Sequence, residues 1–141
     1  MITVFDTSAL IKHYINETDS DRINTVWDTA TLICVSWITE AEMFATFARK
    51  RRESVISPSA IDSAEHRFLA DWPTFTAIEP HRVSSLLPTL HRAHILRGAD
   101  SIQLATALVA RSLAQGEEII FATADERLAK AAKDEGLTII P

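Results

Sequence analysis

Five short apolar runs recur along the chain, and longer segments with helical periodicity separate them. The runs are rich in β-branched residues and only a few residues long, which indicates strands buried on both faces of a sheet. They cover residues 2–5, 32–35, 75–78, 118–122 and 137–140. Because strands that alternate with helices usually pair in parallel, this order predicts a three-layer α/β/α fold with a central parallel sheet of about five strands.

The segments between the runs repeat apolar residues three and four positions apart, as one face of an amphipathic helix does. In the segment 37–52, for example, Trp37, Ala41, Phe44 and Ala48 share a predicted face. The predicted helices cover residues 8–17, 18–30, 37–52, 58–72, 81–97, 99–114 and 124–135.

Proline and glycine mark several of the predicted boundaries. Pro58 and Pro80 stand where the first turn of a helix tolerates proline, and Gly136 stands where a helix should end. Pro88 falls inside a helical segment, so we expect a kink or a break there. The chain has only 3 glycines, which disfavours an all-β fold with many tight turns.

The composition indicates one folded domain over residues 1–141. Hydrophobic residues make up 47% of the chain and charged residues 23%, and the length suffices for one core but not for two ordinary domains. The sequence has no linker, repeat or low-complexity segment. It also has no apolar segment long enough to span a bilayer and no signal-peptide pattern, so we expect a cytoplasmic protein with no membrane contact.

Two acids open predicted helices, where an acidic side chain is a common cap. Asp100 has Gln103 three residues later, a capping-box pattern that favours a structural role. For the other helix, Thr123 and Glu126 make the capping box and leave Asp125 in the first turn without a capping role. The position of Asp125 just past a buried strand therefore favours a functional role.

A third acid, Asp6, directly follows the first predicted strand. It could cap the next helix, although Thr7 and Ser8 could do so without a charge. Ligands of parallel α/β sheets bind beyond the carboxyl ends of the strands, and Asp6, Asp100 and Asp125 all stand at strand ends or helix starts. Carboxylates gathered there repel one another unless a divalent cation neutralises them, and oxygen ligands suit Mg²⁺ or Mn²⁺.

Two glutamates, Glu40 and Glu42, lie in the predicted helix 37–52. Their directions differ by roughly 200° at 3.6 residues per turn, so they cannot easily share one site. Glu42 lies nearer the apolar side, although most such glutamates border the core and extend into solvent. If one of the pair belongs to a site, the helix phase favours Glu42.

Two other candidate centres are weaker. His91 and His94 could ligate zinc at helical spacing, but no cysteine or third histidine accompanies them. The only cysteine, Cys34, lies in an apolar run, so we expect a buried thiol, no internal disulfide and no nucleophile.

The net charge of −5 argues against a nucleic-acid binder, because phosphate contacts favour a basic surface. The basic residues are nevertheless clustered, in residues 49–52 and in residues 91–97. Such clusters are commonly the solvated ends of helices.

The chain carries, in this order, VFDTSALIKHYINE, ITEAEM, LRGADSIQLATA and FATADERLAKAAKDEGL. Together these stretches resemble the PIN domain, and most closely the VapC toxins of bacterial toxin–antitoxin pairs. The resemblance spans residues 2–140. A single such motif would carry little information, but four in order at suitable spacing are specific.

The family's acidic residues correspond to Asp6, Glu42, Asp100 and Asp125. Its two supporting polar residues correspond to Ser8 and Thr123, while Glu40 is an extra acid beside the second position. The resemblance implies a ribonuclease that depends on Mg²⁺ or Mn²⁺, that is often a homodimer, and that a cognate antitoxin inhibits.

On this interpretation, a metal ion would orient a water for in-line attack on a phosphodiester and stabilise charge on the phosphate oxygens. Asp6, Asp100 and Asp125 would hold the ion, and Glu42 would be a further ligand or would orient the water. The two basic clusters would bind RNA at the rim of the acidic pocket, through Arg49, Arg51, Arg52, Arg92 and Arg97.

Two other functions fit the residues less well. An aspartate nucleophile for phosphoryl transfer usually has a second acid two residues later, where this chain has Ser8. A catalytically silent binding module would keep the fold and a partner surface, but the full set of acids argues against it. The motifs do not indicate which RNA is cut, or whether one ion or two take part.

Overall fold

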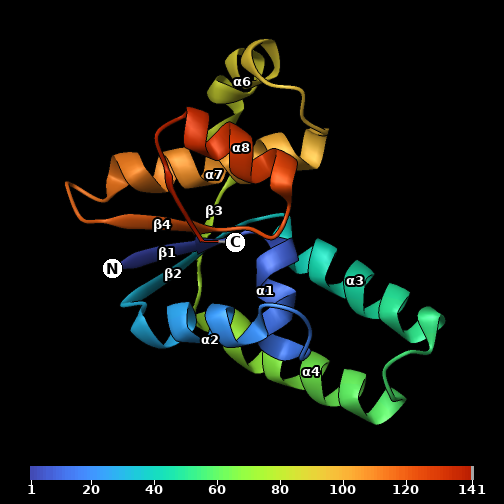
Figure 1. Ribbon diagram of the computed structural model, residues 1–141. Coiled ribbons are helices and arrows are strands. Elements are labelled where there is room, and N and C mark those ends of the chain that lie inside the picture. The colour runs from blue at the N-terminus through green and yellow to red at the C-terminus, as the bar shows by residue number, and fades with distance from the viewer. Residues whose placement is uncertain (141) are drawn as a thin grey trace.

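A five-stranded sheet lies at the centre of the protein, and its strands run parallel (Figure 1). This computed structural model describes residues 1–140, so the last residue of the predicted domain lies outside the described residues. The strands are β1 (Ile2–Phe5), β2 (Leu32–Ser36), β3 (Thr76–Ile78), β4 (Ile119–Ala122) and β5 (Thr138–Ile140). Their order in the sheet is β3-β2-β1-β4-β5. The prediction of a parallel sheet of about five strands is therefore confirmed.

The chain changes direction in the sheet at β1. From β1 it proceeds to β2 and β3 on one side, and it later returns to β4 and β5 on the other side. At the carboxyl ends of these strands, Phe5 is in register with Val35 of β2 and with Ala122 of β4. The residues that follow β1 and β4 therefore meet at a switch point, where open α/β sheets bind ligands.

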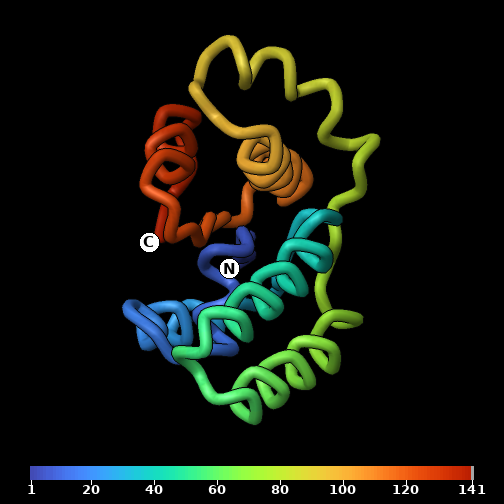
Figure 2. The backbone as a smooth tube through the Cα atoms, turned by 90° about the vertical axis from the view of Figure 1, so that its right-hand side faces the viewer, coloured from blue at the N-terminus to red at the C-terminus, as the bar shows by residue number. Residues whose placement is uncertain are grey.

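Helices cover both faces of the sheet, as predicted. Those from the first half of the chain pack on one face and those from the second half on the other (Figure 1, Figure 2). They are α1 (Thr7–Tyr14), α2 (Ser20–Thr29), α3 (Thr39–Glu53) and α4 (Pro58–Asp71), then α5 (Pro80–Val83), α6 (Leu87–Ala93), α7 (Gly98–Leu113) and α8 (Glu126–Asp134). No helix within residues 1–140 is both long enough and apolar enough to cross a membrane.

Each face of the sheet has its own hydrophobic core. Alternate residues of a strand point to opposite faces, so Val4 packs under α7 and α8 while Phe5 packs under α1 to α4. All residues of β1 and β4 are buried, which confirms the prediction for the central strands. The same prediction is wrong for the edge strands: two of the three residues of β3 are exposed, and no residue of β5 is fully buried.

The helix boundaries follow the proline and glycine signals. The predicted helix 81–97 breaks into α5, a 3₁₀ turn and α6, and Pro88 lies in the first turn of α6. Pro58 and Pro80 are the first residues of α4 and α5. Gly136 follows α8 with a φ of 78°, a left-handed conformation that glycine adopts without strain.

Candidate active site

Asp6 is the residue that joins β1 to α1. It is the N-cap of α1, and its Oδ1 accepts a hydrogen bond from the backbone N–H of Ala9 at 3.0 Å. The sequence did not decide whether Asp6 or a hydroxyl of Thr7 or Ser8 caps this helix. In the structure the cap is Asp6. Capping points the carboxylate across the carboxyl end of β1, where β4 also ends.

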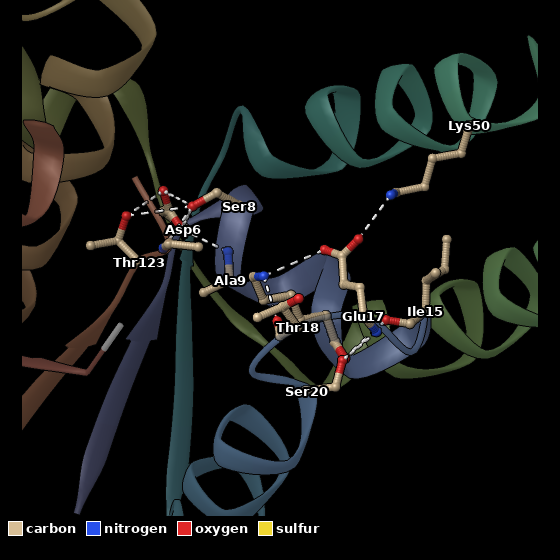
Figure 3. Close-up of polar contacts among 11 residues, drawn as sticks. Asp6, Ser8, Ala9, Ile15, Glu17, Thr18, Ser20, Lys50 and Thr123 are labelled. Carbon is tan, nitrogen blue, oxygen red and sulfur yellow. Dashed lines mark hydrogen bonds and ion pairs between the residues drawn. The ribbon is translucent and has the colours of Figure 1, made fainter. Parts of the chain in front are cut away.

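Only neutral groups donate to the Asp6 carboxylate (Figure 3). The Ser8 hydroxyl lies 2.8 and 2.9 Å from its two oxygens, and the Thr123 hydroxyl donates to Oδ2 at 2.9 Å. Asp6 is 4% exposed, and within residues 1–140 it forms no ion pair with a lysine, arginine or histidine. Burial raises the pKa of Asp6 to about 7, although the hydrogen bonds from Ala9, Ser8 and Thr123 act in the opposite direction.

The loop after β4 completes this corner of the site. The backbone N–H of Ala124 donates to the Ser8 hydroxyl at 2.9 Å, and that of Asp125 donates to the Thr123 hydroxyl at 3.2 Å. The Thr123 hydroxyl thus serves Asp6, and the predicted capping box of Thr123 with Glu126 is wrong. Asp125 itself caps α8, with the N–H of Leu128 donating to Oδ1 at 2.8 Å, so the prediction that Asp125 has no capping role is also wrong.

Asp100 does not cap α7, contrary to the prediction. The helix begins at Gly98 with Arg97 as its N-cap, which places Asp100 within the first turn. The carboxylate of Asp100 lies 3.5 Å from Nε of Arg97 and is 21% exposed. Gln103, its predicted capping-box partner, points instead toward Glu42.

Glu42 faces the acids from α3. Its Oε2 accepts hydrogen bonds from the hydroxyl of Thr7 and, at 3.2 Å, from the amide of Gln103. The sequence did not indicate the contributions of Thr7 and Gln103. The available signal was a polar residue, Gln103, on the buried side of α7 one turn after Asp100.

These residues line one open pocket of about 410 Å³ at the carboxyl end of the sheet. Its lining includes the four predicted acids, Asp6, Glu42, Asp100 and Asp125. Arg49 and Arg97 also line it, whereas Glu40 does not. As they stand, no three His, Cys, Asp or Glu side chains within residues 1–140 are grouped closely enough to hold a metal ion.

The sequence model of the PIN domain matches residues 3–134 of this chain. The chain belongs to the PIN domain family. Two relatives from Mycobacterium tuberculosis, Ribonuclease VapC45 and Ribonuclease VapC49, are each 31% identical over 146 residues. Each alignment covers 99% of this chain and 95% of the relative. The resemblance found in the sequence motifs is therefore confirmed over the full length of the domain.

Two solved structures share the fold of this PIN domain. The FitAcB structure from Neisseria gonorrhoeae matches with a TM-score of 0.67 and 16% identity, and covers 100% of this chain and 97% of that one. The structure of VapBC2 from Rickettsia felis, bound to a DNA fragment from their promoter, matches with a TM-score of 0.62 and 15% identity. It covers 99% of this chain and 98% of that one.

The other predicted site residues of this PIN domain lie away from the pocket. Arg51 forms ion pairs at 2.6 Å with Asp62 and Glu65 of α4, and neither Arg52 nor Arg92 lines the pocket. The rim of the pocket therefore has Arg49 and Arg97 from the two basic clusters, and not the other three arginines.

The two weaker candidates from the sequence, the histidine pair and the cysteine, do not form sites. His91 hydrogen-bonds to Ser101 at 2.8 Å and His94 to Glu135 at 2.7 Å, so the two imidazoles do not converge on a zinc site. Cys34 is buried, as predicted, and burial raises its pKa to about 11. A thiol in that state is a poor nucleophile.

Proposed function

We propose that this PIN domain is a metal-dependent endoribonuclease of the VapC type, the toxin of a toxin–antitoxin pair, and that it hydrolyses RNA phosphodiester bonds in the acidic pocket. One observation carries the proposal: carboxylates from four separate elements line one pocket at the switch point of the sheet. The relatives support the substrate class, because the two that match 99% of the chain are named ribonucleases.

The donor set of the pocket fits Mg²⁺ or Mn²⁺. It consists of oxygen atoms, and its most buried member, Asp6, has only neutral donors around it. Asp6, Asp100 and Asp125 would hold the ion, although they line the pocket farther apart than the ligands of one ion. When bound, the ion would stabilise charge on the phosphate oxygens and make a water more acidic.

The protein's own groups orient the reactants. Ser8, Thr123 and the N–H of Ala9 fix the Asp6 carboxylate, which keeps its direction without a charged partner. Glu42, which α3 carries into the pocket, would orient the attacking water through a carboxylate oxygen. Holding water and phosphate in line in this way removes much of the entropic cost of the reaction.

Arg49 and Arg97 are the proposed contacts to RNA. They line the same pocket as the acids, so each guanidinium can pair with a phosphate beside the bond to be cut. Local positive charge is needed, because the net charge of −5 repels RNA at long range.

The proposal includes the cellular context of a toxin. We infer a cytoplasmic protein of one PIN domain, residues 1–141, that forms a homodimer and binds a cognate antitoxin. The antitoxin partner is tested by purifying the protein from cells that also express any small protein encoded next to it. We expect a stable complex that lacks ribonuclease activity. Removing the partner should restore the activity.

An RNA digest tests the activity itself. Purified protein should cut a single-stranded RNA in Mg²⁺ or Mn²⁺ and should stop in excess chelator. Glu42→Gln should lower the rate by about 10²-fold or more, the usual contribution of a group that handles the attacking water. Glu40→Gln is the matched control, because Glu40 lies outside the pocket.

Three outcomes would count against the proposed activity. They are cutting that persists in chelator, no cutting of any RNA by partner-free protein, and equal losses in Glu40→Gln and Glu42→Gln. The second outcome would support a silent binding module. If the protein does cut RNA, mapping the cut ends would identify the sequence that it prefers.

A further inference from the structure

The Glu42 carboxylate is held through one of its two oxygens. Oε2 accepts from the hydroxyl of Thr7 and from Nε2 of Gln103, whereas Oε1 has no hydrogen-bond partner within residues 1–140. Glu42 lines the acidic pocket, so the side chain is anchored at one oxygen and available at the other.

The two donors are buried and belong to different layers of the fold. Thr7 is the first residue of α1 and is 9% exposed, and Gln103 lies in α7 on the other face of the sheet and is 2% exposed. Gln103 also donates to the hydroxyl of the buried Thr39 at 3.2 Å, at the start of α3. The amide thus joins α7 to the helix that carries Glu42.

The orientation of the Gln103 amide favours the carboxylate. Its Nε2 points to three acceptors, Glu42, Thr39 and Thr7, while its buried Oε1 has no partner within the described part of the chain. Leaving a buried oxygen unpaired is unfavourable. The opposite orientation would set this oxygen against the charged Oε2 of Glu42 and would remove a donor from it.

We propose that Thr7 and Gln103 are positioning residues that fix Glu42 through Oε2 and so direct Oε1 at the attacking water. The inference rests on the proposed ribonuclease function and names two groups that support it. In this proposal each residue acts through its hydrogen bond to Glu42 and not on the reacting atoms directly. Both donors are neutral, so they hold the carboxylate without forming an ion pair with it.

Substitutions that remove one donor at a time test the inference. Thr7→Val and Gln103→Met keep the approximate side-chain size, and each should lower kcat by about 10- to 100-fold, the usual effect of removing a group that orients a catalytic side chain. The Kd for a non-cleavable RNA should stay within about twofold. Thr7→Ser keeps the hydroxyl and should recover most of the rate.

Thr106→Val is the matched control for the loss of a buried hydroxyl. Thr106 lies on α7 like Gln103, is 0% exposed, and donates to the backbone oxygen of Ile102 at 2.8 Å instead of to Glu42. The melting temperatures of all variants should be measured, so that a rate loss from partial unfolding is recognised.

A double-mutant cycle with Glu42→Ala separates positioning from a general structural effect. If Thr7 acts through Glu42, Thr7→Val should cause no further loss in the Glu42→Ala protein, measured in single turnover with enzyme in excess. The inference is overturned if Thr7→Val keeps the full rate, or if it lowers the rate equally with and without Glu42. A wild-type protein that cuts no RNA would overturn the proposed function, and this inference with it.

Discussion

The two ends of helix α1 carry carboxylates in opposite electrostatic situations. Asp6 caps the first turn and receives hydrogen bonds only from neutral groups. Glu17, just beyond the last turn, lies 3.0 Å from Nζ of Lys50 (Figure 3). It also lies 3.7 Å from Nζ of Lys12. Asp6 is nevertheless the more deeply buried of the two residues, since Asp6 is buried and Glu17 is partly exposed.

The contrast separates an acid that pairs with cations of the fold from one that we propose to be reserved for function. The cations that balance Glu17 are side chains of the protein, Lys12 and Lys50. These ion pairs connect the end of α1 with α3. A buried charge without such a partner is unfavourable, so Asp6 either takes up a proton or needs a positive group from outside the chain. In the proposed function, a divalent cation supplies that positive charge, whereas Glu17 needs none.

The largest expected difference is in RNA cleavage. Asp6→Asn removes the charge at the centre of the proposed site and should lower the cleavage rate by at least about 10²-fold. Glu17→Gln should stay within about twofold of the wild type, because Glu17 does not line the pocket. Initial rates on one RNA at saturating Mn²⁺ give the comparison, and similar losses in the two variants would contradict it.

The next difference is in the pH dependence of stability without metal. The pKa of Asp6 rises from its ordinary value of 3.8 to about 7 on folding. Between these values the folded state holds a proton that the unfolded chain has lost, so the free energy of unfolding falls as pH rises. At about 1.4 kcal/mol per pKa unit, the loss due to Asp6 is a few kcal/mol.

Urea unfolding in excess chelator checks this sign. The free energy of unfolding of Asp6→Asn, relative to wild type, should increase from pH 4.5 to pH 8. Other carboxylates contribute to both proteins, so the difference isolates Asp6. Stability curves of the two proteins that run parallel across this range would show that Asp6 is not an uncompensated buried acid.

Glu17 should show the opposite effect on stability, with a smaller magnitude. Glu17→Gln breaks the contacts to Lys12 and Lys50 and should lower the free energy of unfolding at pH 8 by about 1 kcal/mol. The loss should shrink in 1 M salt, which screens partly exposed pairs. Glu40→Gln serves as the control, and an equal loss there would assign the effect to the substitution itself.

The smallest expected effect separates two arginines of α3. Arg49 lines the pocket, whereas Arg51 pairs with Asp62 and Glu65. Arg49→Ala should weaken binding of a non-cleavable RNA by about threefold to tenfold and lower the salt slope by roughly one. Arg51→Ala should leave both quantities unchanged. A larger loss of RNA affinity in Arg51→Ala than in Arg49→Ala would show that RNA binds at the end of α3 and not at the pocket.

The fold could be predicted because its signals are local. The five apolar runs became the strands, and Pro88 and Gly136 marked a helix break and a helix end. The exposure of β3 and β5 could not be predicted, since the order of strands in the sheet decides which ones lie at the edges. Strand order depends on packing between residues distant in the sequence.

The candidate site was predictable in its acids but not in their partners. Capping assignments failed at Asp100 and Thr123, because tertiary contacts take these side chains away from the local pattern. Helix phase did contain the missing information about α3: Arg49 lies roughly 20° from the direction of Glu42, and Arg51 roughly 180°, at 3.6 residues per turn. The hydrogen bonds of Gln103 depend on the packing of α7 against α3 and α1, which no local pattern encodes.

The most direct test of the central claim is the thermal shift produced by Mn²⁺ in wild type, Asp6→Asn and Glu17→Gln. A ligand that binds only the folded state at 100 times its Kd stabilises it by about 2.7 kcal/mol. We expect the corresponding rise in melting temperature in wild type and Glu17→Gln, with little or none in Asp6→Asn. Equal shifts in all three proteins, or a shift lost only in Glu17→Gln, would contradict a cation site built around Asp6.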